Sequence, residues 1–329
     1  MNIIVLLLLL SCKGRPNTTH LEKDVLSLQA KITLPGVKGR IDHLAYDSMR
    51  RRVFVAALGN NTVEVVDLAA RERVHSITGL HEPQGVAYLP ALGRLVVANG
   101  DNGVCVFYTG DTYTELGSVA LGDDADNVRS YGAKVYVGYG SGGIAVIDPV
   151  AMQKVGNLSL KAHPESFQLG DSGRVYINVP DAGAVVSADL AAGQVDATWE
   201  NRGASANFPM ALDSRGGRLF VGYRHAAQLR VLDARTGMVL ASMPCVGDAD
   251  DIFYDAVTGL VFVSGGEGYV DVFRGNKLIN RLATRKGTRT CLWLSGERKL
   301  IVAVPARGSE EAELWVYGIH DSSSPNPRP

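Results

Sequence analysis

Acidic residues recur in this chain at the points where short apolar segments begin. Asp42, Asp126, Glu165 and Asp250 each stand in the polar entry to such a segment. Carboxylate oxygens that converge on one point suit a hard cation such as Ca²⁺, which takes six to eight oxygen ligands. A carboxylate with a raised pKa can also act as a general base on water. These four residues are the candidate metal ligands, and the only cofactor that the sequence indicates is a divalent cation such as calcium.

These acidic positions correspond when the seven segments are aligned on their apolar cores. The aligned positions are Asp42, Gln84, Asp126, Glu165, Phe208, Asp250 and Thr290. The positions two residues earlier are Arg40, Glu82, Asp124, His163, Ala206, Asp248 and Thr288. Residues two apart in an extended strand point to the same side, so we expect both sets to face one surface. With neighbouring polar residues, the candidate binding site comprises Asp42, His43, Gln84, Asp126, Asn127, His163, Glu165, Asp250, Asp251 and Arg289.

The sequence leaves two interpretations of this polar set open. It forms a ligand-binding surface, or it consists of strand ends that are polar because they meet solvent. His43 and His163 are open to the same choice, since each is either an acid–base group or a hydrogen-bonded structural histidine.

The apolar segments belong to a repeat with a period of 39 to 44 residues. Its most constant part occurs as RRVFVAA from Arg51, GRLVVAN from Gly93, AKVYVGY from Ala133, GRVYINV from Gly173, GRLFVGY from Gly217, GLVFVSG from Gly259 and RKLIVAV from Arg298. The unit that begins at Gly247 shows four short apolar runs, separated by turns rich in Gly, Asn and Asp. Seven copies of four short strands predict an all-β fold, a seven-bladed β-propeller of four-stranded antiparallel blades.

The last copy lacks a fourth strand, and the start of the chain supplies a candidate for it. Residues 25–34 read VLSLQAKITL, with Leu26, Leu28, Ala30, Ile32 and Leu34 at a spacing of two. We expect this segment to complete the blade that holds residues 300–304 and 314–317, which would remove an open sheet edge.

These motifs resemble the YVTN-repeat (YncE-like) seven-bladed propellers of bacterial secreted proteins. The resemblance covers roughly residues 25–319 and rests on cores such as VYVGY and LFVGY, each followed by a turn and a V-x-V-x-D strand. It implies the fold. Propellers of this kind serve as binding platforms, lactonases and redox partners, so it leaves the activity open.

The N-terminal segment has the character of an export signal. Residues 3–10 form an unbroken apolar run of eight, which is too short to span a bilayer. The following Leu9-Leu10-Ser11-Cys12 resembles a bacterial lipobox, which implies cleavage before Cys12 and lipidation of that cysteine. The alternative is an ordinary secretion signal, because residues 1–10 contain no Lys or Arg.

The expected organisation is a signal peptide over residues 1–11, a tether over 12–24, the propeller over 25–319 and a disordered tail over 320–329. It places the protein in the bacterial cell envelope, periplasmic or extracellular, with a lipid as its only membrane anchor.

Several functional classes lack their sequence signals. The net charge is −1, and the Lys and Arg residues are dispersed without an aromatic series, so nucleic-acid binding is not expected. The remaining Cys105, Cys245 and Cys291 form no disulfide framework, and no Cys-x-x-Cys-His motif indicates covalent haem. There is no Gly-x-Ser-x-Gly elbow. The glycine-rich residues 138–143 lead into a strand, so we interpret them as a hairpin turn.

Two functions from different classes follow. The first is a non-catalytic, monomeric propeller at the envelope, which binds an unknown small polar ligand or a protein partner. The second is a metal-dependent, lactonase-like hydrolase that uses Asp42, Asp126, Glu165 and Asp250.

Overall fold

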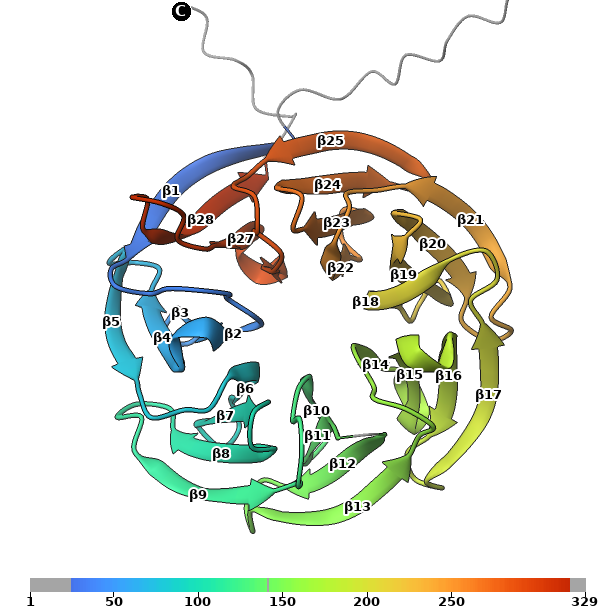
Figure 1. The fold of residues 1–329 in the computed structure, drawn as a ribbon, viewed down its shortest axis with the longest axis horizontal. Coiled ribbons are helices and arrows are strands. Elements are labelled where there is room, and N and C mark those ends of the chain that lie inside the picture. Colours follow the sequence, from blue (N-terminus) through green and yellow to red (C-terminus); the bar gives the residue numbers. More distant parts are fainter. Residues whose placement is uncertain (1–24, 141, 320–329) are drawn as a thin grey trace, which may run out of the picture.

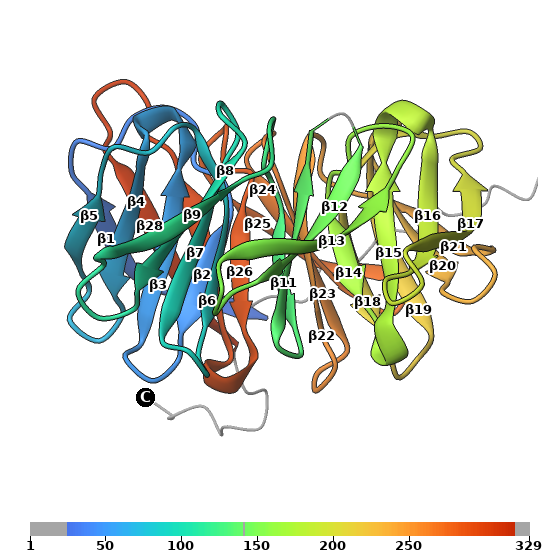
Figure 2. The ribbon, with the colours of Figure 1, turned by 90° about the horizontal axis from the view of Figure 1, so that it is seen from below.

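Seven antiparallel sheets of four strands stand around a common axis in the computed structural model, which describes residues 25–140 and 142–319 (Figure 1). The predicted seven-bladed propeller is therefore confirmed. Figure 2 shows that the inner strands run along the axis of the ring, whereas outer strands such as β9 (Glu115–Ala120) and β13 (Gln153–Ser159) cross them obliquely. This change of direction is the normal twist of a β-sheet.

Each blade contributes one strand to each of four concentric layers. The innermost strands are β2 (Leu44–Asp47), β6 (Pro83–Leu89), β10 (Val128–Tyr131), β14 (Phe167–Leu169), β18 (Ser205–Asp213), β22 (Ala249–Asp255) and β26 (Cys291–Leu294). The second strands are β3 (Arg52–Ala57), β7 (Arg94–Asn99), β11 (Lys134–Tyr139), β15 (Arg174–Val179), β19 (Arg218–His225), β23 (Leu260–Gly265) and β27 (Lys299–Val304).

The two outer layers complete the blades. The third strands are β4 (Thr62–Asp67), β8 (Val104–Thr109), β12 (Gly143–Asp148), β16 (Ala184–Asp189), β20 (Gln228–Asp233), β24 (Tyr269–Arg274) and β28 (Ala312–Ile319). The outermost strands are β5 (Glu72–Ile77), β9, β13, β17 (Gln194–Glu200), β21 (Val239–Pro244), β25 (Lys277–Ala283) and β1 (Leu26–Leu34). Short 3₁₀ turns lie at η1 (Leu58–Asn60), η2 (Asp171–Gly173), η3 (Pro180–Ala182) and η4 (Ser295–Glu297). Within the described chain no helix has the length and apolar character needed to cross a bilayer.

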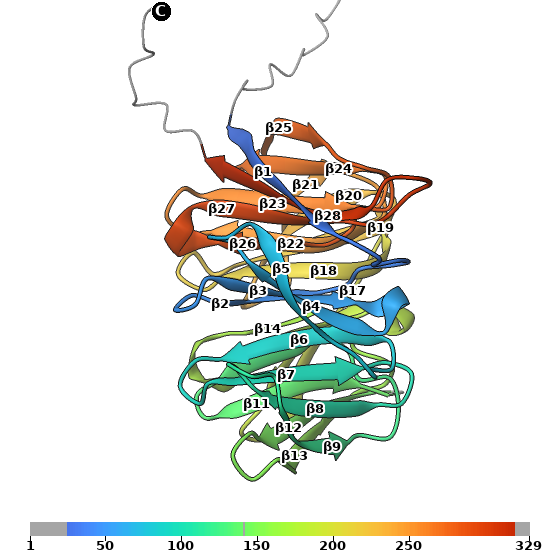
Figure 3. The same cartoon turned by 90° about the vertical axis from the view of Figure 1, so that its left-hand side faces the viewer.

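The ring closes as the sequence predicts, because β1 pairs with β28 in the sheet that also contains β27 and β26 (Figure 3). One detail of the prediction for this strand was wrong, namely that Leu28 lies on the same face as Leu26 and Ile32. Leu28 is 46% exposed instead of facing the blade interior. The register shifts between Leu28 and Ala30, and such a bulge breaks the alternation of sides.

The core lies between the blades. Each buried apolar cluster joins two adjacent blades, and the cluster formed by Phe54, Val65 and Leu95 with their neighbours joins the first and second. Burying one large apolar side chain contributes about 1.5–3 kcal/mol, so these faces hold the ring together. They also fix the inner strands against one another, which determines what faces the channel.

The acidic residues that end several third strands have the structural role that turn chemistry predicts. The Asp67 carboxylate accepts hydrogen bonds from the backbone N–H groups of Ala69 and Ala70 at 2.8 and 2.9 Å. Asp148, Asp189 and Asp233 do the same in their own turns. Cys105, Cys245 and Cys291 are buried free thiols.

Candidate functional site

Equivalent residues of different blades form a ring at one mouth of the channel, because the inner strands share one register. The backbone N–H groups of Asp42, Asp126 and Glu165 donate to the carbonyls of Ala56, Gly138 and Asn178, respectively. These bonds, of 2.7 to 3.0 Å, link the same two positions in each blade. The sequence alignment of these three acidic residues is therefore correct.

The alignment of the seventh blade was wrong by one residue. The carbonyl of Thr290 accepts from the N–H of Ala303, just as the carbonyl of His43 accepts from the N–H of Ala56. Thr290 is thus the equivalent of His43, and Arg289 is the equivalent of Asp42. The strand β26 reads Cys-Leu-Trp-Leu, an unbroken apolar run without alternation, so apolar alignment alone could not fix its register.

The second predicted set does not form extended strands in every blade. Left-handed backbone angles, with φ between 35° and 57°, occur at Glu82, Asp124, Ala206 and Asp248. A left-handed residue turns the chain, so the geometric reason for the expectation fails at these positions. Even so, Arg40, Asp124 and His163 of this set line the same hollow as Asp42, Asp126 and Glu165.

The polar side chains surround a small hollow at this mouth, which we call the mouth hollow. It has a volume of about 130 Å³ and is lined by Arg40, Asp42, His43, Gln84, Asp124, Asp126, Asn127, His163, Glu165, Ser166, Phe208, Arg224 and Asp250. Eight of the ten sequence-predicted site residues are among them. The other two lie elsewhere, since Asp251 is one position deeper in the channel and Arg289 pairs with Asp248 at the rim.

Two arginines neutralise the acidic residues on one side of the mouth hollow. The Arg40 guanidinium lies 3.0 Å from Oδ2 of Asp42 and 3.6 Å from Oδ2 of Asp250. Arg224 forms an ion pair with the other oxygen of Asp250 and lies over the ring of Phe208, 3.7 Å from its centroid. Burial raises the pKa of Asp42 to about 6 and also raises the pKa of Asp250, against the opposing charge of Arg40.

His43 lies at the floor of the mouth hollow and contacts acidic residues from three blades. Its Nδ1 is 3.5 Å from Oδ1 of Asp251, and its Nε2 is 4.0 Å from Asp42 and from Asp126. Burial alone would lower the pKa of His43, but Asp251 together with the other two carboxylates raises it to about 10. His43 is therefore an imidazolium at neutral pH. The Asn127 amide lies 3.0 Å from Nε2, and the imidazolium N–H requires that the amide turn its oxygen toward the ring as the acceptor.

His163 and Glu165 line the opposite side of the mouth hollow, where their charges attract each other. His163 Nδ1 lies 2.6 Å from the carbonyl of Gly140 and 3.5 Å from Asp124. Burial opposes its charge, but Asp126 and the Gly140 carbonyl raise the pKa of His163 to about 9. Burial, reinforced by the charge of Asp126, raises the pKa of Glu165 to about 7. The mouth hollow thus contains carboxyl groups that titrate near neutral pH beside permanent cations.

The four candidate metal ligands line this one hollow, but cations lie between them. Among residues 25–140 and 142–319, no group of three or more His, Cys, Asp and Glu side chains has the arrangement of a metal site. Guanidinium and imidazolium groups therefore supply the positive charge that a calcium ion would otherwise bring. Oδ2 of Asp42 and Oδ2 of Asp250 are buried and, despite their ion pairs with Arg40, have no aligned hydrogen-bond donor.

Sequence reasoning missed Ser166 and Arg224 of the mouth hollow, and of these two Arg224 carries charge. Arg224 lies near the end of the second strand β19, whereas all the predicted site residues lie at the entries to first strands. The second strand ends at the face where the first begins, so a charged residue directly after GRLFVGY was the available signal.

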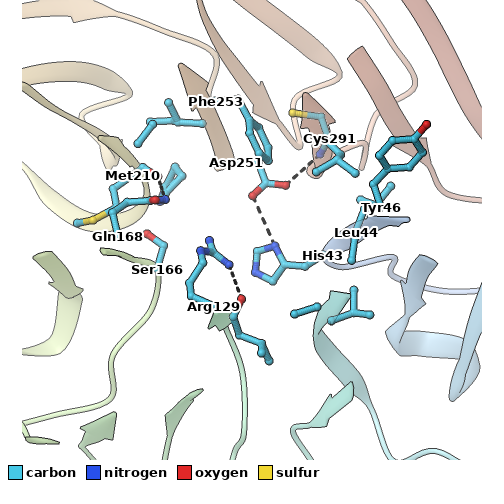
Figure 4. A pocket seen from close by; sticks show the side chains of 18 of the residues that line it. His43, Leu44, Tyr46, Arg129, Ser166, Gln168, Met210, Asp251, Phe253 and Cys291 are labelled. Atoms are coloured by element: carbon cyan, nitrogen blue, oxygen red, sulfur yellow. Dashed lines mark hydrogen bonds and ion pairs between the residues drawn. The ribbon is translucent and has the colours of Figure 1, made fainter. Parts of the chain in front are cut away.

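A larger cavity of about 410 Å³ continues along the channel behind the mouth hollow (Figure 4). We call it the inner cavity, and residues from all seven inner strands line it. His43 and Ser166 line both spaces, so they mark the boundary between them. Asp251 accepts a hydrogen bond from the backbone N–H of Cys291 at 3.0 Å on the inner side of this boundary.

Comparisons with known proteins identify the fold and leave the family open. No family model matches the chain. No curated protein matches it either. Among solved structures, a chain of "Crystal Structure of Mitotic Checkpoint Complex" superposes with a TM-score of 0.78 at 15% identity, over 98% of this chain and 99% of that chain. At this identity the likeness shows a shared fold alone. The YVTN-type assignment and the lipoprotein-type signal remain predictions, and Cys12 lies outside the described residues.

Proposed function

We propose that this protein is a non-catalytic binding propeller whose mouth hollow takes a polar ligand that donates hydrogen bonds. One observation carries the proposal. Two buried carboxylate oxygens, on Asp42 and Asp250, face this hollow without an aligned hydrogen-bond donor. Each is held by the charge of Arg40 without an aligned hydrogen bond, so it keeps an acceptor site that a ligand hydroxyl or ammonium group can fill.

The size and charge of the mouth hollow narrow the ligand class. A volume of about 130 Å³ is below the roughly 300–1,000 Å³ of sites that enclose a whole small molecule. It therefore accepts one polar end of a ligand. Five carboxyl groups, two guanidinium groups and two imidazole groups line it, so its wall offers both donors and acceptors. A polyhydroxylated group satisfies both kinds of partner, and an ammonium group satisfies the acceptors.

Titration calorimetry with three probes tests this proposal: a monosaccharide (glucose), a polyamine (spermidine) and calcium chloride. We expect glucose or spermidine to bind the wild type and to bind the Asp126→Asn/Asp250→Asn variant about tenfold or more weakly, because the variant loses two acidic acceptors. Asp189→Asn is the matched control, since Asp189 lies in a blade turn away from the channel. Failure of both probes to bind the wild type, or equal binding by the variant, would contradict the proposal. Stoichiometric calcium binding would instead support the metal hypothesis.

A hydrolase is the second candidate, and the titration behaviour of the mouth hollow favours it. The raised pKa values of Glu165 and Asp42, about 7 and about 6, suit proton transfer at neutral pH. His163 and Arg40 lie beside them and could stabilise developing negative charge. Hydrolysis of γ-butyrolactone, followed by acid release with and without calcium, tests this candidate. Activity that is lost in Glu165→Gln would support it, and a rate equal to that without protein would exclude this substrate.

We also propose that the propeller is held at the bacterial envelope through a lipid on Cys12. Support comes from the apolar run over residues 3–10 and the Leu-Leu-Ser-Cys sequence that follows it. Stable anchoring needs more than one acyl chain, which lipoprotein processing supplies in the signals that this segment resembles. Expressed in a bacterium, the wild type is expected in the membrane fraction and Cys12→Ser in the soluble fraction. Identical fractionation of the two proteins would contradict the anchor.

A further inference from the structure

The inner cavity differs from the mouth hollow in the character of its wall. At about 410 Å³ it is within the size range of small-molecule sites, roughly 300–1,000 Å³. Its lining combines apolar and aromatic residues, such as the half-buried Tyr46 and Phe253, with polar groups that make up the larger part of the exposed wall (Figure 4). A ligand with an apolar body would replace water along these walls.

A single arginine enters this cavity from β10. Arg129 pairs with Tyr136 at the centre of the second strand of its blade. The residues at the same register in the other six blades are Ala45, Ala87, Gln168, Ala211, Phe253 and Leu292. Arg129 is therefore the only charged side chain of this ring.

The guanidinium of Arg129 has no carboxylate partner. Its Nη1 donates to the carbonyl of Val128 at 2.9 Å, and its Cζ lies 5.8 Å from the ring centroid of Phe167. In the described part of the chain it takes part in no ion pair. Burial lowers its pKa, against the more distant charges of Asp251 and Asp126. A guanidinium has five N–H groups in a planar fork, so most of this donor capacity remains for another partner.

Asp251, the carboxylate across the cavity, is already bound to other groups. One of its oxygens lies 3.5 Å from Nδ1 of His43, and the other accepts the backbone N–H of Cys291 (Figure 4). Gln168 donates its amide to the carbonyl of Met210 at 2.9 Å. These neighbours are held in place by their own partners and leave Arg129 uncompensated. Arg129 is half-buried, and a charge that is partly removed from water and lacks a counter-charge favours an anion in this cavity.

We propose that the inner cavity binds a small organic carboxylate, with its carboxyl group paired to Arg129 and its body beside Phe253 and Leu292, which hold the same register position in their blades. The planar fork of an arginine matches the two oxygens of a carboxylate. A single unpaired guanidinium suits a monoanion better than inorganic phosphate, which needs several donors. This site is independent of the function proposed for the mouth hollow.

Benzoate is a suitable probe, and benzamide is its neutral counterpart of nearly the same shape. In titration calorimetry with the full-length protein, benzoate is expected to bind at one site and benzamide to bind at least tenfold more weakly. Arg129→Gln should weaken benzoate binding about ten- to a hundredfold, since it removes a charge-assisted pair. Arg129→Lys keeps the charge but loses the fork, so its affinity should lie between the two. Arg202→Gln is the matched control, because that side chain is 88% exposed.

The proposal is overturned if benzoate does not bind the wild type at millimolar concentration. It is also overturned if the wild type, Arg129→Gln and Arg129→Lys bind benzoate equally. Binding of inorganic phosphate without benzoate binding would contradict the apolar part of the assignment. Should Arg129→Gln fail to fold, Arg129→Lys and the benzamide comparison decide the outcome.

Discussion

The mouth hollow and the inner cavity lie in one channel, yet they differ in whether their charged side chains have partners of opposite charge. In the mouth hollow, Arg40, Arg224, His43 and His163 alternate with the carboxyl groups that line it. In the inner cavity, Arg129 is the one arginine of the lining and pairs with no acid in the described chain. The two spaces are separated by little more than the His43–Asp251 pair.

This difference indicates which ligand charge each space favours. Charges that largely compensate one another require no single counter-charge from outside, so the mouth hollow suits a polar ligand that donates hydrogen bonds, whether through hydroxyl or ammonium groups. A charge that remains uncompensated is stabilised by an opposite charge, so the inner cavity favours an anion. The same fold therefore offers two chemically distinct sites along one axis.

The largest effect is expected for the pair that separates the two spaces. Asp251→Ala removes the partner of the buried His43 imidazolium and the acceptor for the Cys291 N–H. Breaking a buried ion pair from one side typically costs about 3–5 kcal/mol, and we expect a loss in that range from urea unfolding. The His43→Ala/Asp251→Ala double variant should lose less than the two single variants added together. Additive losses would mean that the pair contributes little.

The next effect compares the two arginines directly. Arg40→Gln leaves the Asp42 and Asp250 carboxylates without their shared partner and is expected to cost about 1–3 kcal/mol. Arg129→Gln removes a charge that has no counter-charge, so the free energy of unfolding should stay the same or rise. Urea unfolding of both variants, without added ligand, measures the contrast. A loss for Arg129→Gln as large as that for Arg40→Gln would show that Arg129 is paired within the fold.

Sequence reasoning reached the fold and the mouth hollow because both depend on periodicity. The copies of the RRVFVAA-type strand gave the number of blades, and the polar residues before the first strands gave eight residues of the hollow. The predicted positions of single residues were wrong where the backbone departs from the repeat geometry. The register of Thr290 and the bulge beside Leu28 depend on turns and local twist, which apolar patterns do not record.

The inner cavity escaped prediction for a different reason. Arg129 lies within strand β10, and the sequence of that strand alone does not distinguish it from the other first strands. The predicted site residues were all taken from strand entries. The signal appears only when equivalent positions of all blades are compared, since most hold Ala, Leu or Phe where the third blade holds Arg129. That Arg129 is unpaired follows from side-chain distances across the channel, which no pattern in one sequence supplies.

A third prediction concerns pH and the mouth hollow alone. Burial raises the pKa of Glu165 from an ordinary value of 4.5 to about 7. The folded protein therefore holds this proton more tightly than the unfolded chain. Its stabilising contribution is complete below pH 4.5 and is lost as the pH rises through about 7. The stability of the wild type should fall over this interval by on the order of 1 kcal/mol relative to Glu165→Gln. Urea midpoints across the interval measure it, with Glu72→Gln on the exposed strand β5 as the control, which should follow the wild type.

The smallest effect is expected at the rim, where the pairing of the mouth hollow meets solvent. The Arg289 guanidinium lies 2.6 Å from Asp248, and about a third of each side chain is exposed. Exposed ion pairs contribute about 0.2–1 kcal/mol and are weakened by salt. Arg289→Gln should therefore lower stability by less than about 1 kcal/mol, and the loss should shrink as sodium chloride is added. The cost of Arg40→Gln should change less with salt, because Asp42 and Asp250 are buried. Equal salt sensitivity of the Arg289→Gln and Arg40→Gln variants would contradict the distinction between an exposed ion pair at the rim and buried ion pairs in the hollow. Arg289 occupies the ring position of Asp42 but does not line the mouth hollow, so its replacement should leave binding of glucose or spermidine unaffected.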